Sequence, residues 1–482
     1  MREPSTGLQT DLYQLTMAQG YWKLGRADQQ AVFNLTFRKP PFGAGVALAC
    51  GLAQAVEFIE RFRYEGAQLE FLATLQGNDG GRLFDPRFLA WLGEQKPRID
   101  LDAIPEGSAC FPHEPLLRVR GPLAHCQLLE TGLLTILNFQ TLIATKAARI
   151  VAAAGGDAVL EFGLRRAQGL DGGLSASRAA YLGGVAATSN VEAGMRFGIP
   201  VRGTHAHAWV MAFEHEQDAF AAYADAMPNN CVFLVDTYDT LTGVDRAIVE
   251  AAKLHERGHK MAGIRLDSGD LGELSKAARA KLDAAGLHDA AIVASSDLDE
   301  YAIDELKLSG AAISVWGVGT RLATAYDQPA LGGVYKLAAL QQADGSWRRM
   351  VKLSENPIKT SLPGLLQVRR VRVAGTPIAD VIYDEELGAP KPGEPGWSLD
   401  PAKSDTLALP ADATHEDLLV PVLRQGKRVG EPASLEQSRA RAREQLADFP
   451  GLLRGGHHPV VLEPTLAKLE RELIAAARTR SP

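Results

Sequence analysis

From about Glu130 to Tyr335 the chain alternates between short apolar runs and longer amphipathic stretches. The runs are typical of buried strands, and stretches such as Val244–Arg257 and Leu271–Ala285 repeat apolar residues at helical spacing. The predicted strands are Val159–Phe162, Val201–Thr204, Val232–Val235, Gly263–Leu266, Ile292–Ser295 and Ile313–Gly317. Strands that alternate with helices form parallel sheets, and this many repeats predict an α/β fold with an incomplete (β/α) barrel.

The two ends of the chain predict helices and strands that do not alternate regularly. Helices are predicted at Thr10–Leu24 and Val46–Phe62, strands at Ala31–Phe37 and Leu116–Val119, and a long helix at Leu133–Ala154 leads into the barrel. The C-terminal part is strand-like, with a surface loop at Gly388–Gly396 and a closing helix at Leu466–Arg478, capped by Thr465. We expect both ends to form one α/β sandwich domain that flanks the barrel.

The expected domain limits follow from these changes of pattern. Residues 1–130 form the N-terminal part of the sandwich domain, 131–335 form the barrel, and 336–482 complete the sandwich and add a small C-terminal subdomain.

Composition argues against nucleic-acid-binding, disulfide-rich, secreted and membrane-spanning proteins. The 482 residues carry 51 basic and 58 acidic side chains, a net charge of −7, so nucleic acid is a poor candidate partner. The four cysteines are far apart, which favours a reducing, cytoplasmic location over a disulfide scaffold. The first residues, MREPSTGLQTDLYQL, have no apolar core, so no signal peptide is expected. The longest apolar run, Leu133–Ala154, is interrupted by Lys146 and Arg149, so no membrane span is expected.

Polar residues follow every predicted barrel strand. In a (β/α) barrel the loops after the strands meet at one face and form the active site. Arg, His, Asp, Ser, Thr and Gly suit phosphates, sugar hydroxyls and divalent cations, although Ser and Asp at these positions also cap helices. The residues in question are Arg165, Arg166, Thr204, His205, His207, Asp236, Arg265, Asp267, Ser268, Gly269, Asp270, Ser295, Asp297, Gly319 and Thr320.

Within this set the residue types suggest separate roles. Gly319 and Thr320 follow the last strand, where barrels commonly bind phosphate. Asp267 and Asp270 suit ribose hydroxyls or magnesium-bound water. His205 and His207 lie two apart on an extended segment and so face the same side, which fits either a metal or a nucleophile toward a phosphoryl group.

Three other motifs are better explained without function. His255-Glu-Arg-Gly258-His259 matches a zinc-protease pattern, but Gly258 is expected to end the helix before His259. Asn34 begins a glycosylation sequon inside a predicted strand. His457 and His458 are expected in a solvated loop.

Several longer motifs resemble one family. TDLYQLTMA, EFGLRRAQG, GTHAH, VDTYD, IRLDSGDL, SSDLDE, GVGT and GGVYKL occur in the order found in the longer form of nicotinate phosphoribosyltransferase, and the resemblance covers nearly the whole chain. The resemblance implies a homodimer with shared active sites. It also implies that nicotinate, phosphoribosyl pyrophosphate, ATP and water give nicotinate mononucleotide, pyrophosphate, ADP and phosphate in NAD biosynthesis, with Mg²⁺ as cofactor.

The resemblance also assigns roles to individual residues. It implies that His207 is phosphorylated, that Thr204 and Arg265 contact nicotinate, and that Tyr13, from the partner subunit, stacks on the pyridine ring. Thr320 is implied to contact a phosphate of phosphoribosyl pyrophosphate. Further motif residues with less defined roles are Arg166, Asp236, Asp267, Ser268, Gly269 and Gly319. The absence of an acid at position 205 favours nicotinate over nicotinamide, because an acid there would repel a carboxylate.

Other functions stay open at this point. A nicotinamide or quinolinate phosphoribosyltransferase would share the phosphate loops, and a non-catalytic phosphate-binding barrel would share the fold. Quinolinate has two carboxylates and would need a more basic pocket than these loops provide.

Overall fold

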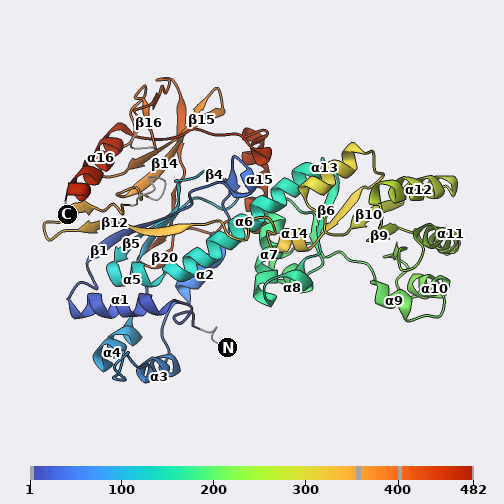
Figure 1. The fold of residues 1–482 in the computed structure, drawn as a ribbon, viewed down its shortest axis with the longest axis horizontal. Helices are drawn as coiled ribbons and strands as arrows, with labels where there is room; N and C mark the ends of the chain where they lie inside the picture. The colour runs from blue at the N-terminus through green and yellow to red at the C-terminus, as the bar shows by residue number, and fades with distance from the viewer. Residues whose placement is uncertain (1–4, 354–359, 400–403, 480–482) are drawn as a thin grey trace. The chain divides into compact units, whose positions relative to one another are not determined.

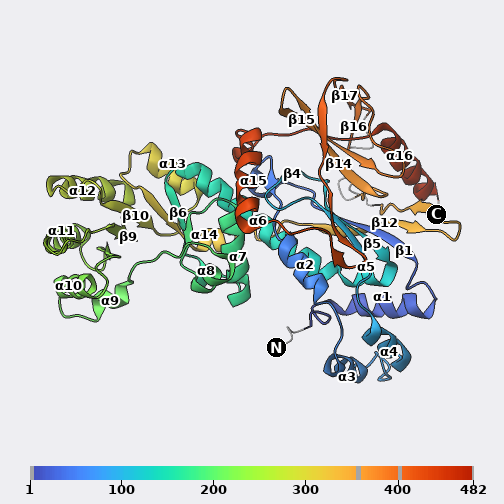
Figure 2. The ribbon, with the colours of Figure 1, turned by 180° about the vertical axis from the view of Figure 1, so that it is seen from behind.

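The computed structural model describes residues 5–353, 360–399 and 404–479. The chain packs as two compact units (Figures 1 and 2). Unit 1 combines Met1–Leu142 with Ala330–Pro482, and unit 2 is the continuous segment Ile143–Pro329. The domain limits at 130 and 335, and the separate C-terminal subdomain, stay predictions. Across the described residues, no helix is long and apolar enough to cross a membrane.

Unit 2 is built on a six-stranded sheet in which every strand pairing is parallel. The strand order is β7-β6-β11-β10-β9-β8. The strands are β6 (Ala158–Glu161), β7 (Ala187–Thr188), β8 (Val232–Leu234), β9 (Gly263–Leu266), β10 (Ala291–Ser295) and β11 (Val315–Val318). The predicted α/β fold with a parallel sheet is confirmed.

Helices connect these strands, and α11 and α12 pack against β9 and β10. The 3-10 turn η2 (Leu164–Arg166) follows β6. The helices are α7 (Leu170–Leu182), α8 (Val191–Phe197), α9 (His207–Met211), α10 (Glu216–Ala226), α11 (Thr240–Glu256), α12 (Leu271–Ala284), α13 (Glu300–Leu308) and α14 (Thr320–Ala323). Because each connection returns the chain to the start of the next strand, the carboxyl ends of the strands share one edge.

One predicted strand of unit 2 is not formed. Val201–Thr204 makes only an isolated parallel bridge, between Val201 and Thr188 of β7. The flanking residues explain this, since Pro200 has no N–H to donate and Gly203 has a high conformational entropy. The structure places the two-residue strand β7 next to β6 instead, a strand too short to give a periodic signal.

Unit 1 contains a seven-stranded antiparallel sheet that draws strands from both ends of the chain, in the order β13-β12-β1-β5-β3-β19-β20. Its strands are β1 (Gln30–Thr36), β3 (Asp100–Ala103), β5 (Pro115–Pro122), β12 (Val334–Gln341), β13 (Trp347–Arg349), β19 (Val420–Arg424) and β20 (Lys427–Arg428). Its helices and turns from the N-terminal part are α1 (Leu12–Lys23), η1 (Pro41–Gly43), α2 (Leu52–Glu60), α3 (Gly66–Thr74), α4 (Pro86–Glu94) and α5 (Leu123–Leu128); α6 (Glu130–Ala154) contains the boundary to unit 2.

A second, mixed sheet of unit 1 comes from the C-terminal part, in the order β17-β16-β21-β15-β14-β18. Its core includes Val371, Ala379, Val381 and Val461. The strands are β14 (Leu366–Val373), β15 (Thr376–Asp384), β16 (Gly396–Ser398), β17 (Thr406–Leu407), β18 (Thr414–Asp417) and β21 (Val460–Leu462). The accompanying elements are α15 (Leu435–Asp448), η4 (Leu452–Arg454) and α16 (Pro464–Thr479), and the strands β2 (Ala47–Leu48) and β4 (Ala109–Cys110) form a separate pair.

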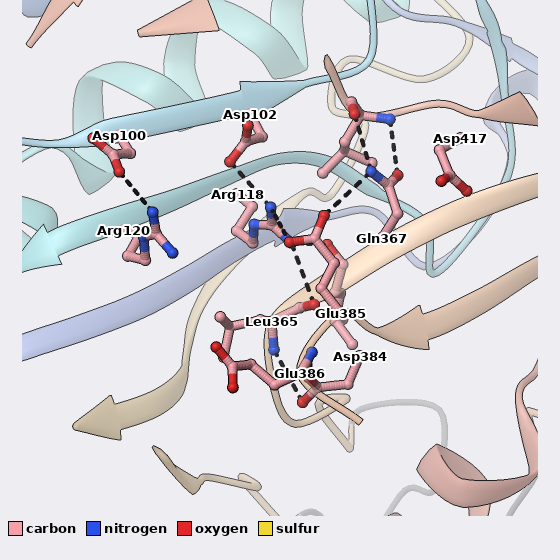
Figure 3. Close-up of polar contacts among 12 residues, drawn as sticks. Asp100, Asp102, Arg118, Arg120, Leu365, Gln367, Asp384, Glu385, Glu386 and Asp417 are labelled. Atoms are coloured by element: carbon pink, nitrogen blue, oxygen red, sulfur yellow. Dashed lines mark hydrogen bonds and ion pairs between the residues drawn. The ribbon is translucent and has the colours of Figure 1, made fainter. Parts of the chain in front are cut away.

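Arg118 on β5 connects the two sheets of unit 1 (Figure 3). Its guanidinium pairs with Asp102 at 3.0 Å and with Glu385 at 2.8 Å, and it donates to the carbonyl oxygens of Leu365 and Leu366. Because Arg118 is buried, these partners together satisfy the fork of donors that arginine presents. The antiparallel sheet is thereby joined to the start of β14.

Three local predictions for unit 1 need correction. The helix predicted from Val46 begins only at Leu52, because Gly51 has a left-handed backbone (φ 105°) that no helix continues. Thr465 lies inside α16, and the Glu463 carboxylate accepts the N–H of Thr465 at 2.8 Å in its place as cap. His458 is buried, while His457 is exposed as expected.

Candidate active site

A polar cavity of about 500 Å³ opens at the carboxyl ends of the unit 2 strands. Eleven of the residues singled out after the predicted strands line it: Arg165, Arg166, Thr204, His205, His207, Arg265, Asp267, Ser295, Asp297, Gly319 and Thr320. The remaining lining residues are Phe162, Ser189, Gly203, Ala206, Ser296 and Gly317. The parallel topology therefore gathers side chains that are up to about 150 residues apart in sequence onto one surface.

His207 is the first residue of α9 and is held by two neighbouring loops. Its Nδ1 lies 3.1 Å from Oγ1 of Thr237, and its Nε2 lies 3.7 Å from Oδ2 of Asp267. When Nδ1–H donates to the Thr237 hydroxyl, the lone pair is on Nε2. The imidazole is 39 % exposed, so this nitrogen is accessible from the cavity. The arrangement suits a nucleophile.

Arg265 on β9 and Thr204 form a pair beside His207. Nη1 of Arg265 donates to the Thr204 hydroxyl, and Nη2 lies 4.0 Å from Oδ1 of Asp267. The Nε of Arg265 is buried without a hydrogen-bond partner in the described chain. Burial lowers the pKa of Arg265, although a guanidinium stays charged at neutral pH. The group therefore has donor capacity left for an anionic ligand.

Asp236 organises the loop after β9 and does not itself line the cavity. Its Oδ2 accepts the backbone N–H of Asp267 at 2.9 Å and the hydroxyl of Ser268 at 2.6 Å. Its Oδ1 is buried and has no partner among the described residues. The Asp267 carboxylate in turn accepts the Ser295 hydroxyl. These contacts fix the position of Asp267 opposite His207.

The structure gives Gly269 and Asp270 local backbone roles. Gly269 has a φ of 80°, which the turn before α12 requires and which favours glycine. Asp270 caps α12 by accepting the N–H of Glu273 at 3.0 Å. The helix-cap explanation therefore holds for Asp270.

The loops after β6 and β11, which are candidates for binding phosphate, are closely packed against each other. A Cβ on Gly163 would lie 2.9 Å from the carbonyl oxygen of Gly319 and 2.4 Å from Cβ of Ala323. Thr320 begins α14 directly after Gly319. Only a glycine at 163 lets the loop that carries Arg165 and Arg166 approach the Gly319–Thr320 turn this closely.

Tyr13 lies in unit 1, on α1, and its side chain is 47 % exposed. It is therefore not among the residues that line the unit 2 cavity, and its stacking role stays a prediction.

Some residues of the site were not singled out from the sequence. Thr237, which contacts His207, and Ser296, which lines the cavity, follow strands, and this position was a usable signal. Phe162 and Ser189 carried no signal that separates them from ordinary strand-end residues. Ser296 and Asp297 have positive φ angles of 151° and 33°. Strained backbone in non-glycine residues is concentrated at functional sites.

The other motifs lie elsewhere. Helix α11 ends at Glu256 and Gly258 has a φ of 79°, so His259 lies beyond the helix, as predicted. Within residues 5–353, 360–399 and 404–479 no cluster of three or more His, Cys, Asp or Glu side chains is arranged to hold a metal. Asn34 is buried in β1 and donates to the Gly364 carbonyl at 3.1 Å.

Three family comparisons cover most of the chain. Residues 8–138 match the N-terminal domain of nicotinate phosphoribosyltransferase, residues 158–371 match the nicotinate phosphoribosyltransferase family, and residues 367–469 match its C-terminal domain.

Named relatives agree with these matches. The chain is 48 % identical to nicotinate phosphoribosyltransferase of Bacillus subtilis over 397 residues, 81 % of this chain and 79 % of that one. It is 37 % identical to the human enzyme of that name, with 98 % of both chains covered. The crystal structure of human nicotinic acid phosphoribosyltransferase superposes with a TM-score of 0.82 at 36 % identity, over 96 % of this chain and 99 % of that one.

A further solved structure is similar in fold. Nicotinate-nucleotide pyrophosphorylase from Pyrococcus furiosus has a TM-score of 0.69 at 21 % identity, over 92 % of this chain and 95 % of that one. Matches along the whole length and identities well above 30 % lead to one conclusion: this chain belongs to the nicotinate phosphoribosyltransferase family.

Proposed function

We propose that the unit 2 cavity is the active site at which this chain, an enzyme of NAD biosynthesis, joins nicotinate to the ribose of phosphoribosyl pyrophosphate. One observation carries this assignment: Arg265 with Thr204, His207, and the Gly319–Thr320 turn all line the same cavity. A carboxylate binder, a nucleophile and a phosphate turn are the groups that this reaction requires.

Arg265 and Thr204 bind the nicotinate carboxylate. The buried guanidinium has an Nε that is unpartnered in the part of the chain that the structure describes, and its planar shape suits a carboxylate. The Thr204 hydroxyl, which accepts from Nη1, lies next to it. The charge and geometry favour nicotinate over the uncharged nicotinamide. Tyr13, an exposed aromatic on α1, stacks on the pyridine ring from the partner subunit of a homodimer.

The loops after β6 and β11 bind phosphoribosyl pyrophosphate. Backbone N–H groups of the Gly319–Thr320 turn and the Thr320 hydroxyl bind a phosphate, and Arg165 and Arg166 neutralise phosphate oxygens. The ribose C1 acquires positive charge as pyrophosphate leaves, and the pyridine nitrogen attacks with its own lone pair. Catalysis then consists of positioning and of stabilising the leaving group, and no general base is needed.

The carboxylates of this site fit Mg²⁺. Asp236 has a buried carboxylate oxygen without a partner among the described residues, and Asp236 accepts the backbone N–H of Asp267. Mg²⁺ is commonly held by one or two carboxylates, water and substrate phosphates, so a cage of protein ligands is not required. When bound, the ion supplies charge neutralisation for the pyrophosphate.

ATP hydrolysis is coupled to the reaction through His207. The Nε2 lone pair attacks the γ-phosphorus of ATP, a bond from nitrogen to phosphorus forms, and the bond to the ADP oxygen breaks. Thr237, which accepts from Nδ1–H, keeps the attacking nitrogen unprotonated. Hydrolysis of the phosphohistidine then drives the equilibrium toward nicotinate mononucleotide.

The parallel sheet is an incomplete (β/α) barrel. The sheet ends at β7 and β8. In the segment after Pro200, Arg202 donates its N–H to the carbonyl of Thr188 on β7 at 3.0 Å, and the side chain of Asn230, shortly before β8, donates to the Gly203 carbonyl at 3.5 Å. These contacts support a barrel in which an irregular segment takes the place of a strand.

The enzyme acts in the cytoplasm. The four cysteines, Cys50, Cys110, Cys126 and Cys231, are buried as free thiols, which supports a reducing compartment.

The test is a direct assay of the purified chain with nicotinate, phosphoribosyl pyrophosphate, Mg²⁺ and γ-labelled ATP. We expect nicotinate mononucleotide, labelled protein, and little product from nicotinamide or quinolinate in competition. Product from quinolinate with release of carbon dioxide, or phosphoribosyl pyrophosphate binding without turnover, would reject the assignment. Omission of Mg²⁺ should abolish product.

A further inference from the structure

His205 lines the active-site cavity but its ring is buried. The residue is 7 % exposed, and its imidazole packs edge to face on Tyr223, with ring centroids 4.7 Å apart. Phe220 and Phe233 lie further around it, at 6.2 and 6.4 Å. A side chain in this position contributes mainly through the protein contacts that it makes, since only 7 % of the residue is exposed.

The ring accepts a hydrogen bond from the parallel sheet. Its Nε2 accepts the backbone N–H of Leu234 at 3.2 Å. Leu234 is fully buried on β8, the last strand of the sheet, so within the described chain this N–H has no neighbouring strand on its outer side. A buried backbone donor without an acceptor is costly, and the imidazole supplies the acceptor.

The bond requires a neutral imidazole. Nε2 can accept only while it carries a lone pair, so the ring proton is on Nδ1, which faces the carbonyl oxygen of Ala206 at 3.5 Å. Burial among the aromatic rings lowers the pKa of His205 to about 4, and the positive charge of Arg265 acts in the same direction. The ring therefore keeps its acceptor throughout the neutral pH range.

The backbone of the same residue belongs to the catalytic segment. The carbonyl oxygen of His205 accepts the Thr204 hydroxyl at 3.0 Å, and that hydroxyl also accepts from Arg265. Two residues later is His207. The segment has no regular strand pairing beyond Val201 in the described chain, so side-chain contacts determine where it lies.

We propose that His205 is a positioning residue: its imidazole joins the Gly203–His207 segment to the outer edge of β8 and so places Thr204 and His207 in the cavity. This inference rests on the proposed function for its kinetic consequence. It also changes the role of position 205, from a neighbour of the nicotinate carboxylate to an anchor of the segment that binds it.

The test compares substitutions that keep or remove the acceptor. Gln in His205→Gln carries Oε1 at a similar reach to Nε2, whereas His205→Met has similar volume and no comparable acceptor. We expect kcat/KM to fall at least tenfold for both nicotinate and phosphoribosyl pyrophosphate in His205→Met, and to stay within about threefold of wild type in His205→Gln. His215→Met, at an exposed histidine before α10, is the matched control and should be unchanged.

Amide hydrogen exchange gives a second readout that is independent of activity. Exchange at residues 232–236 should accelerate at least tenfold in His205→Met and not in His205→Gln. If His205→Met does not fold, His205→Asn, whose side chain is too short to reach Leu234, takes its place. The proposal is wrong if Met and Gln behave alike in both measurements, or if only the KM for nicotinate changes. A wild-type chain without activity would instead reject the proposed function, while the exchange comparison would still decide whether the bond exists.

Discussion

The hydroxyl of Thr237 lies 3.1 Å from Nδ1 of His207, on the side of the ring opposite the nitrogen that faces Asp267. The two residues come from different loops, one after β8 and the other at the start of α9. When Nδ1–H donates to this hydroxyl, the lone pair is on Nε2, which is then the nitrogen that reacts. It also gives the proposed phosphohistidine a specific and testable geometry.

Replacing His207 by Ala should abolish labelling of the protein by γ-labelled ATP and remove the stimulation of product formation by ATP. The physical reason is the loss of the only group assigned to carry the phosphoryl group. Acid-labile, alkali-stable label measured after gel filtration is the readout. His255→Ala removes an exposed histidine at the end of α11 and should label normally; retained label in His207→Ala would disprove the role of His207.

Replacing Thr237 by Val should slow labelling about tenfold without abolishing it. The substitution keeps the shape of the side chain and removes one hydrogen bond, which is worth ~1–1.5 kcal/mol. The ring then samples the tautomer in which Nε2 is protonated and cannot attack. The rate of single-turnover labelling should fall while the KM for nicotinate stays constant, and an unchanged rate would show that Thr237 does not set the tautomer.

Replacing Arg265 by Met should raise the KM for nicotinate roughly 10- to 100-fold, because a hydrogen bond between charged groups is worth ~1.5–3 kcal/mol. Arg265→Lys should recover only part of this affinity, since an ammonium cannot form the paired bonds of the guanidinium. Initial rates at varied nicotinate give the comparison. Arg257→Met, at an arginine whose partner Asp225 lies on the surface, should leave the KM unchanged.

His125 should make the protein less stable at acid pH. It is 3 % exposed, its Nδ1 accepts the N–H of Arg98 at 3.2 Å, and burial lowers its pKa to about 4. Above pH ~6.5 the ring is neutral in both states. Below it the unfolded chain binds the proton first, so stability is lost as the pH falls from ~6.5 toward 4, by about 2 kcal/mol between pH 7.5 and 5.

Urea unfolding at several pH values checks this. His125→Gln, which does not titrate in this range, should show a flatter dependence of unfolding free energy on pH by about that amount. An identical slope in the two proteins would mean that folding does not lower the pKa of His125.

Replacing Arg370 by Met should lower the free energy of unfolding by ~3–5 kcal/mol. Arg370 and Asp380 are both fully buried in unit 1 and pair at 2.6 Å, so the substitution leaves a carboxylate without its cation. Adding Asp380→Leu should restore part of the loss. Arg87→Met, at an arginine that is 81 % exposed, should leave the free energy of unfolding nearly unchanged in the same measurement.

The gathering of polar residues at one edge of the sheet could be predicted from the sequence because it follows from the parallel topology. Once the apolar runs are assigned to a parallel sheet, residues as far apart as Arg165 and Thr320 are expected on one edge, and both line the cavity. The roles of individual carboxylates did not follow in the same way. Asp236 and Asp270 both come after strands, yet one holds a neighbouring loop and the other caps a helix, a difference set by loop packing.

Burial set by distant residues was equally hard to predict. His458 follows another histidine and precedes a proline, which is typical of a solvated loop. In the structure its ring packs on Phe111 and Phe449, with centroids 4.4 and 5.0 Å away, and its Nε2 lies 3.4 Å from Asp380. Phe111 is far from His458 in sequence, so the local pattern could not indicate this contact. The prediction of a solvated loop at His458 was therefore wrong.

The shared sheet of unit 1 has a consequence for how the protein is made. Gln29 donates to the carbonyl of Gln341, 312 residues later, and β1 pairs with β12 along its length. On a ribosome that synthesises from the N-terminus, β1 and β3 emerge long before their C-terminal partners β12 and β19, whereas the continuous unit 2 is complete first. Apolar strand edges therefore stay unpaired for most of synthesis, and a chain that terminates early leaves them open to aggregation.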